Sequence, residues 1–267
     1  MEIKKIFLKE NESDVCLTAY LPYSGDRFAD AILICPGGGY GQVCDGHEGE
    51  AIAMAFSARG FRCFVLKYSV GKKAKFPTPL IEASLAMAHI KDNAEIYGID
   101  PERVFVMGFS AGGHLAASLG TLWHKDWLNT HLAMPFGKNK PKGMVLCYPV
   151  LSYFEKTHKG TFRNALGEEP NAENTREISL DLQVDENTVP AFLWHTVDDA
   201  TVPVENSLRM ISALHRQGVY TEAHFYPHGT HGVATANSVI YGKDASKLDP
   251  RIQNWVDLAA DFMRMIT

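Results

Sequence analysis

The sequence is poor in cysteine, and the cysteines that it has do not form pairs. There are five, Cys16, Cys35, Cys44, Cys63 and Cys147, and no two of them form a C-x-x-C motif. Disulfide frameworks and structural zinc clusters need paired cysteines at short, regular spacings. We therefore expect reduced and mostly buried thiols.

Long apolar runs are also missing. The first residues, MEIKKIFLKENESD, lack the apolar core of about seven or more residues and the small-residue cleavage site that mark a secretory signal. No later stretch approaches the roughly 18 apolar residues of a membrane span. These absences predict a cytoplasmic protein that does not bind a membrane.

Positive charge is not in excess either. The 267 residues include 26 Lys and Arg against 31 Asp and Glu, a formal net charge of -5, and no basic stripe is present. Nucleic acids and anionic membranes recruit concentrated positive charge, so neither is expected as a partner. A small-molecule ligand is expected instead, and a homodimer is left open.

The chain does have two kinds of apolar segment that alternate along its length without a linker or an internal repeat. Short β-rich runs predict strands at 4–8, 15–21, 31–35, 61–68, 103–108, 144–148, 191–195 and 222–226. Segments with helical periodicity separate most of these runs. The alternation predicts an α/β fold with a mostly parallel sheet of about eight strands, helices on both faces and an antiparallel first pair. We expect one domain over residues 1–267.

Apolar residues at helical spacing predict which side of a helix faces the sheet. In the last predicted helix these residues are Trp255, Leu258, Ala259, Phe262 and Ile266. In the helix predicted after residue 203, Val204, Leu208 and Ile211 are expected to face the core.

The loop after residue 108 carries a nucleophile pattern. Ligands bind at the carboxyl ends of strands in such sheets, and here a strand-like run leads into Gly108-x-Ser110-x-Gly112 and then a helix. The pattern is typical of a sharp turn that exposes a serine, with glycines where a Cβ would collide with neighbouring backbone. The alternative is a serine that only caps the helix. We favour Ser110 as a nucleophile.

Three glycines follow the strand predicted at 31–35, in the sequence Pro36-Gly37-Gly38-Gly39-Tyr40. They allow the backbone to approach a substrate closely and to aim N–H groups at a developing oxyanion. A flexible turn is the plain alternative. A phosphate loop is not supported, because there is no G-x-G-x-x-G, no G-K-[ST] and no helix that starts directly from these glycines.

A serine nucleophile needs a histidine base and an orienting carboxylate, which in this fold follow it in the order acid, then histidine. The loop after the seventh predicted strand offers Asp198 and Asp199, and the residues alone do not decide between them. The loop after the last strand offers His228 and His231, and His231 is favoured because it lies farther past the strand, beside a glycine. A metal site made from both histidines lacks a third ligand at suitable spacing, so we predict no metal and no cofactor.

Together these loops resemble the α/β-hydrolase superfamily. The likeness covers most of the chain and is closest to small carboxylesterases related to acetyl-xylan esterases, bifunctional feruloyl and acetyl-xylan esterases and hormone-sensitive-lipase-like enzymes. The motifs that carry it are PGGGY at 36–40, EGEAIAMAFSARGF at 48–61, YGIDPERVFVMGFSAGGHLAASL at 97–119, HTVDDATVPVENS at 195–207 and YPHGTHG at 226–232. The resemblance implies the α/β-hydrolase fold with a minimal cap or none.

The resemblance also assigns the catalytic residues. In the family pattern the acid lies three residues before a Val, here Val202, and four after a His, which selects Asp199 over Asp198. The histidine is the second one of H-x-x-H-G, His231. A Ser110, Asp199 and His231 triad is therefore what the resemblance implies.

By the same match, the oxyanion donors are the backbone amides of Gly38, Gly39 and Ala111. One position departs from the pattern, because many relatives have a histidine where this chain has Pro36. The departure favours esterases that act on acetylated or feruloylated sugars. A partial lid could come only from the segments 121–141, 152–188 and 233–249.

Substrate contacts are the least constrained part of the sequence. Tyr40 and Trp123 are predicted to bind the substrate, with stacking on a sugar ring as the reason and plain packing as the alternative. The resemblance implies a serine carboxylesterase that hydrolyses short acyl esters, mainly acetyl esters, of sugars or xylo-oligosaccharides. A serine peptidase, a lactone hydrolase and a non-catalytic binding module with the same fold are the competing interpretations.

Overall fold

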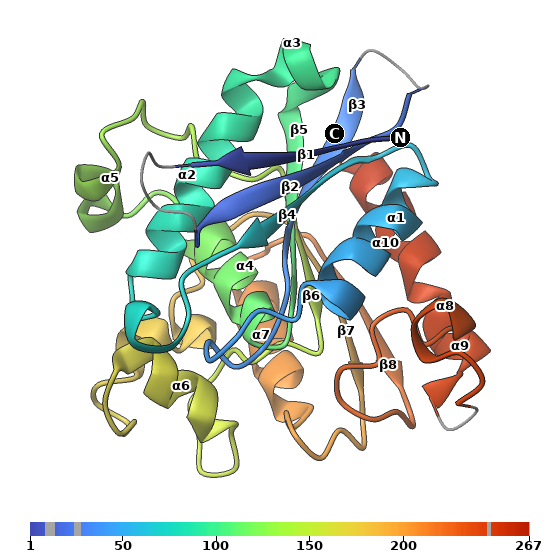
Figure 1. Ribbon diagram of the computed structural model, residues 1–267. Helices are drawn as coiled ribbons and strands as arrows, with labels where there is room; N and C mark the ends of the chain where they lie inside the picture. Colours follow the sequence, from blue (N-terminus) through green and yellow to red (C-terminus); the bar gives the residue numbers. More distant parts are fainter. Residues whose placement is uncertain (9–13, 24–27, 245–246, 267) are drawn as a thin grey trace.

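The structure, a computed structural model, describes residues 1–8, 14–23, 28–244 and 247–266. The described residues form an eight-stranded sheet with helices on both sides (Figure 1). The strands are β1 (Glu2–Phe7), β2 (Cys16–Leu21), β3 (Ala29–Cys35), β4 (Arg62–Lys67), β5 (Ile99–Phe109), β6 (Met144–Cys147), β7 (Ala191–Thr196) and β8 (Thr221–Tyr226). Their order across the sheet is β1-β2-β4-β3-β5-β6-β7-β8.

The helices lie between the strands and after the last strand. They are α1 (Ala51–Ser57), α2 (Thr78–Asp92), α3 (Ala94–Tyr97), α4 (Ala111–Leu122), α5 (Asp126–Leu132), α6 (Lys159–Leu166), α7 (Glu205–Arg216), α8 (Ser238–Tyr241), α9 (Pro250–Gln253) and α10 (Trp255–Met265). A π-helical turn at Gly46–Glu50 precedes α1, and short 3-10 turns lie at Gly71–Lys73, Arg176–Ile178 and Leu180–Leu182. In the described parts of the chain, no helix has both the length and the apolar character to cross a bilayer.

Strand pairing confirms the predicted sheet. All eight expected strands are present, and β4, β3, β5, β6, β7 and β8 pair in parallel. The first two strands are antiparallel, as expected from the absence of a helix between them, and β2 also pairs antiparallel with β4. Because parallel neighbours need crossover connections, the helices lie on the two faces of the sheet.

Two buried apolar layers cover the faces of the sheet. Successive residues of a strand point to opposite faces, so Leu33 packs with Leu115 of α4 on one face while Ile34 packs on the other. The second face is covered by α1 and α10, which contribute Phe56 and Trp255. Figure 1 shows α2, α4 and α7 on one side and α1 with α10 on the other.

The prediction for the core-facing side of α7 is wrong at one position, Leu208, whereas Ile211 is partly buried and packs against the core. Leu208, which the periodicity placed in the core, is 50% exposed, whereas Met210 and Leu214 are fully or almost fully buried. Asn206 and Ser207 also face inward. The Asn206 side chain accepts hydrogen bonds from the backbone N–H groups of Leu151 and Ser152, which follow β6. The Ser207 hydroxyl forms a hydrogen bond with the buried His195 near the end of β7. These buried polar groups need partners, so Asn206 and Ser207 take inward positions on α7 while Leu208 faces the solvent.

The segments that could supply a lid form short elements only. Residues 121–141 contain α5, and residues 152–188 contain α6 and two 3-10 turns. The described part of 233–249 contains α8. Of these elements, α6 lies beside the loop that follows β3, as described below.

Candidate active site

Ser110 lies on a tight turn between β5 and α4, as the Gly-x-Ser-x-Gly pattern predicts. Its backbone has φ 53° and ψ -118°, a conformation that costs a non-glycine residue about 1–3 kcal/mol. A Cβ on Gly108 would lie 2.1 Å from the carbonyl oxygen of Gly112, and a Cβ on Gly112 would lie 2.1 Å from that of Cys35. The two glycines are therefore required for the turn, which presents Ser110 at the N-terminus of α4.

The structure joins Ser110, His231 and Asp199 through two hydrogen bonds. Nε2 of His231 lies 2.8 Å from Oγ of Ser110, and Nδ1 lies 2.7 Å from Oδ2 of Asp199. Because a carboxylate oxygen only accepts, the Nδ1–H of His231 donates to Asp199, and Nε2 is left to accept the Ser110 hydroxyl proton. This arrangement allows a histidine base to activate a serine hydroxyl.

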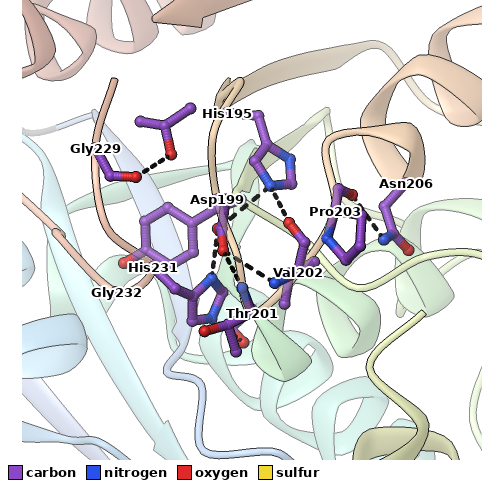
Figure 2. Close-up of polar contacts among 12 residues, drawn as sticks. His195, Asp199, Thr201, Val202, Pro203, Asn206, Gly229, His231 and Gly232 are labelled. Atoms are coloured by element: carbon purple, nitrogen blue, oxygen red, sulfur yellow. Dashed lines mark hydrogen bonds and ion pairs between the residues drawn. The ribbon is translucent and has the colours of Figure 1, made fainter. Parts of the chain in front are cut away.

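The Asp199 carboxyl group is buried and has partners at both oxygens (Figure 2). Its Oδ1 accepts the backbone N–H groups of Thr201 and Val202, each at 2.9 Å. Its Oδ2 accepts from His231 and lies 3.5 Å from Nε2 of His195. Burial alone would raise the pKa of this carboxyl group, but the hydrogen bonds from the two histidines and the backbone hold the pKa well below its usual range. Asp199 is therefore suited to remain a carboxylate that orients His231.

Asp198 and His228 form a separate pair nearer the surface. Nδ1 of His228 lies 3.0 Å from Oδ2 of Asp198, and the Gly229 N–H donates to Oδ1 at 2.8 Å. The histidine and aspartate side chains are 77% and 50% exposed. The hydrogen bonds of Asp198 hold the start of the histidine loop, which we define as residues 227–236, against the loop that follows β7. Of the two candidate acids, Asp199 is the one that contacts the histidine bonded to the serine.

The glycine loop, defined here as residues 36–42, passes beside the Ser110 turn. A Cβ on Gly37 would lie 3.0 Å from Cβ of Ser110, so the loop backbone packs directly against the serine. The loop closes on itself through two N–H groups that donate to the carbonyl oxygen of Gly38 at 3.0 and 3.1 Å. The glycines therefore form a narrow turn that borders the serine.

The three amides predicted to bind an oxyanion are free donors. Gly38 and Gly39 have φ values of 124° and 64°, a region that favours glycine. Neither amide donates to a protein acceptor among the described residues. Ala111 is the first residue of α4, so its N–H has no acceptor within the helix. The structure thus offers unpaired N–H groups on the two segments that meet at the serine.

Two residues from the segment between β6 and β7 approach this site without any sequence motif to mark them. Asn164 on α6 donates to the carbonyl oxygen of Gly39 at 2.8 Å. His158, just before α6, lies where its Cε1 would be 3.8 Å from a Cβ on Gly39. Burial lowers the pKa of His158, and the positive charge that His231 can carry lowers it further. α6 therefore covers one side of the glycine loop.

The predicted substrate contacts of Tyr40 and Trp123 need correction. The Tyr40 side chain is 3% exposed, and its hydroxyl lies 2.9 Å from Nδ1 of His114. Trp123 is 6% exposed and follows the last residue of α4, which places it about 20 Å along the helix axis from Ser110. Both side chains pack in the interior, which was the alternative considered from the sequence.

His114 connects the glycine loop to α4 in the interior. Its Nε2 lies 2.8 Å from the carbonyl oxygen of Ile178, which can only accept, so Nε2 carries the proton and Nδ1 accepts the Tyr40 hydroxyl. The side chain is 1% exposed. Burial lowers the pKa of His114 to about 4 from an ordinary value of 6.5.

We expect the free energy of unfolding to fall as the pH drops from 6.5 to 4. In that interval the unfolded chain takes up a proton at His114 and the folded protein does not, which removes about 3 kcal/mol. A His114→Gln variant keeps one donor and one acceptor and should show a shallower pH dependence. Urea unfolding of both proteins across this range measures the difference, and equal slopes would contradict the prediction.

One group of possible metal ligands is found among the described residues, formed by Cys44, His47 and Glu48, whose ligand atoms lie within 4.8 Å of one another. Both carboxyl oxygens of Glu48 already accept hydrogen bonds, from the Gly37 N–H and the Tyr148 hydroxyl, each at 2.8 Å. The Glu48 carboxyl group is therefore already engaged by protein donors.

Two cavities lie at different distances from the proposed catalytic residues, and only one of them borders His231. A cavity of about 390 Å³ borders His231 and carries polar side chains, among them Asp198, Thr201, His228 and Thr230. A larger cavity of about 600 Å³ lies at the opposite ends of the strands, between residues 135–142 and 186–190. None of the catalytic, oxyanion or substrate-binding residues predicted from the sequence lines the larger cavity.

The protein family described as BD-FAE matches residues 17–214 of this chain. Among curated proteins, the chain is similar to Endo-1,4-beta-xylanase B of Butyrivibrio fibrisolvens, with 37% identity over 228 residues, 84% of this chain and 35% of that protein. It is also similar to an acetylxylan esterase of Xylanibacter ruminicola, with 30% identity over 207 residues, 76% of this chain and 40% of that protein. The chain thus spans 35% to 40% of the length of these two relatives.

Solved structures match over nearly the whole chain. An acetyl ester-xyloside bifunctional hydrolase from Caldicellulosiruptor lactoaceticus has a TM-score of 0.84 and 35% sequence identity, covering 98% of this chain and 96% of that one. A carboxylesterase from Lactobacillus plantarum has a TM-score of 0.85 and 26% identity, covering 99% and 97%.

Proposed function

Because this chain belongs to the BD-FAE family and has the α/β-hydrolase fold, we propose that it is a serine esterase that removes acetyl groups from acylated sugars. The observation that carries the proposal is the pair of hydrogen bonds that links Ser110 to His231 and His231 to Asp199. A histidine held in this tautomer beside a serine at a helix N-terminus is arranged for acyl transfer.

In the first half of the reaction, Ser110 attacks the ester carbonyl carbon while its proton passes to Nε2 of His231. The carbonyl oxygen becomes negative and accepts hydrogen bonds from the amides of Gly38, Gly39 and Ala111. The tetrahedral intermediate then loses the alcohol as its C–O bond breaks, and His231 gives the proton to the leaving oxygen. An acyl group remains on Ser110.

Water completes the cycle by the same steps. His231 takes a proton from water, the hydroxide attacks the acyl carbon, and Ser110 leaves with the proton returned by His231. Asp199 keeps the proton of the imidazole on Nδ1 throughout and stabilises the imidazolium that forms twice in each cycle. The low pKa of the Asp199 carboxyl group fits this role, because the group remains charged at neutral pH.

Two observations favour an acetylated sugar as the substrate. Two of the similar proteins are an acetylxylan esterase and an acetyl ester-xyloside bifunctional hydrolase. In addition, the cavity beside His231 carries hydroxyl, imidazole and carboxyl groups, which can hydrogen-bond the hydroxyl groups of a sugar. Both observations concern the alcohol side of the ester and the acetyl group, so a panel of esters tests them together.

We expect the protein to hydrolyse p-nitrophenyl acetate and acetylated xylo-oligosaccharides. Turnover of p-nitrophenyl octanoate should be lower by at least about 10-fold, because each misplaced methylene costs binding in the transition state. Protein whose serine has been blocked by a fluorophosphonate gives the background. Faster turnover of the octanoate, of peptide anilides or of lactones would overturn the acetyl esterase proposal in favour of a lipase, a peptidase or a lactone hydrolase.

The same fluorophosphonate separates an enzyme from a binding module. Labelling at Ser110 is expected, because only an activated serine reacts quickly with this probe. Folded protein that takes no label would instead support a non-catalytic module with the hydrolase fold.

A further inference from the structure

Glu48 is a buried acidic residue that the proposed reaction does not use. It lies in the π-helical turn before α1, and it is 3% exposed. A carboxyl group is rarely buried to this extent unless protein donors satisfy its oxygens. The donors to Glu48 therefore indicate what the residue does.

The first donor belongs to the glycine loop. The Gly37 N–H donates to Oε2 of Glu48 at 2.8 Å. Gly37 is also the residue that packs against Ser110, since a Cβ placed on it would lie 3.0 Å from Cβ of Ser110. The carboxyl group of Glu48 thus holds the glycine loop at the point where the loop meets the serine, directly before the amides of Gly38 and Gly39.

The second donor leads to the catalytic histidine. The Tyr148 hydroxyl donates to Oε1 of Glu48 at 2.8 Å and accepts the Ala234 N–H of the histidine loop at 3.2 Å. The Tyr148 ring packs edge-on against His231, with a centroid distance of 5.0 Å and an interplanar angle of 72°. Burial raises the pKa of the Tyr148 hydroxyl well above its usual value, so the hydroxyl keeps its proton and remains a donor.

We propose that Glu48 is a positioning residue that fixes the distance between the oxyanion amides of the glycine loop and the base His231. One carboxyl group bridges two segments that are far apart in the sequence, because one oxygen holds the glycine loop and the other holds Tyr148 beneath His231. This assignment rests on the proposed esterase function, and it adds a residue that touches neither substrate nor serine hydroxyl.

Replacing Glu48 with glutamine tests the assignment. The amide of the Glu48→Gln variant would keep the shape of the side chain but provide one acceptor where two donors now point, so either the Gly37 N–H or the Tyr148 hydroxyl would lose its acceptor. We expect kcat for p-nitrophenyl acetate to fall about 10- to 100-fold, because the amides of Gly38 and Gly39 would shift away from the oxyanion. KM should change by less than about 3-fold, because the lost contacts act on the transition state.

Asp30→Asn serves as the matched control. Asp30 is also a partly buried carboxylate that accepts two hydrogen bonds, both from Arg103. It lies near the start of β3, at the opposite end of the strand from the glycine loop. This variant should lower the thermal midpoint while kcat per fluorophosphonate-labelled site remains that of the unmodified protein.

Two further measurements distinguish positioning from structural support. The rate constant for phosphonylation of Ser110 should fall in Glu48→Gln by the same factor as kcat/KM, because the phosphonyl oxygen occupies the oxyanion position. If Glu48→Gln is less stable but keeps its kcat per labelled site, the assignment is overturned. A wild-type protein without hydrolysis or labelling would instead overturn the proposed function itself.

If Glu48→Gln does not fold, the Tyr148→Phe variant provides a second test of the proposed role of Glu48. The phenylalanine keeps the ring against His231 and leaves the Glu48 bond to Gly37, but it removes the connection between Glu48 and the histidine loop. We expect kcat to fall by about 10-fold with little change in KM. An unchanged kcat in this variant would overturn the assignment.

Discussion

Ser110→Ala is expected to lower kcat for ester hydrolysis by about 10⁶-fold while the protein remains folded. The hydroxyl is the only group that the proposed mechanism can acylate, and its removal leaves His231 Nε2 without a proton to accept. Stability should be kept or slightly improved, because alanine fits the same turn. The measurement is the initial rate on p-nitrophenyl acetate, corrected for spontaneous hydrolysis.

Ser118→Ala is the matched control for this substitution. Ser118 lies two turns farther along the same helix, is 1% exposed and donates its hydroxyl to the carbonyl oxygen of His114. Its replacement removes a buried hydroxyl from α4 without touching the site. Retained hydrolysis in Ser110→Ala, or an equal loss in Ser118→Ala, would contradict the assignment of the nucleophile.

Asp199→Asn is expected to lower kcat by about 10⁴-fold. The structure indicates how the asparagine would be oriented: Oδ1 of Asp199 accepts the Thr201 and Val202 N–H groups, so the amide oxygen must take that place. The amide NH₂ then faces Nδ1 of His231, which can only accept from it. The imidazole proton therefore moves to Nε2, the atom that must be free to take the proton of Ser110.

The neighbouring carboxylate provides the control for this second prediction. Asp198→Asn should change kcat by less than about 3-fold, because Asp198 contacts the exposed His228 and not His231. The kcat values of the two variants are compared on p-nitrophenyl acetate, which has no sugar that could contact Asp198 in the cavity beside His231. A larger loss in Asp198→Asn than in Asp199→Asn would reverse the choice between the two acids.

Local chemistry explains why the nucleophile turn was predictable. Gly108, Ser110 and Gly112 are spaced within one turn, and a Cβ on Gly108 would clash with Gly112 of the same motif. The clash at Gly112 comes from Cys35 at the end of the neighbouring strand β3. The central strands β3, β4, β6 and β7 were predictable because burial on both faces of a sheet leaves short, nearly continuous apolar runs.

The choice between Asp198 and Asp199 was not a local question. The residues alone left it open, the family resemblance favoured Asp199, and the structure brings Asp199 to His231. Adjacent residues in a turn point in different directions, so one carboxylate meets the catalytic histidine while the other meets a surface histidine. Only the path of the histidine loop decides which is which.

The aromatic and acidic residues show the same limit. Tyr40 belongs to the glycine loop and Trp123 directly follows the nucleophile helix α4, yet both side chains turn into the interior. The role of Glu48 was not predictable from the sequence, because its partners Gly37 and Tyr148 come from other parts of the chain. No spacing in the sequence records a contact between residues 100 positions apart.

The sequence by itself determined the alternation of strands and helices, the turn that presents Ser110, and the short list of acids and histidines that could serve it. These features follow from periodicity and from the residue types and spacings of short motifs. Tertiary structure alone decided which acid meets His231, which side of α7 is buried, and how Glu48 joins the glycine loop to the histidine loop. The reason is physical: buried polar groups must find partners, and those partners are supplied by whichever distant segments the folded sheet brings together.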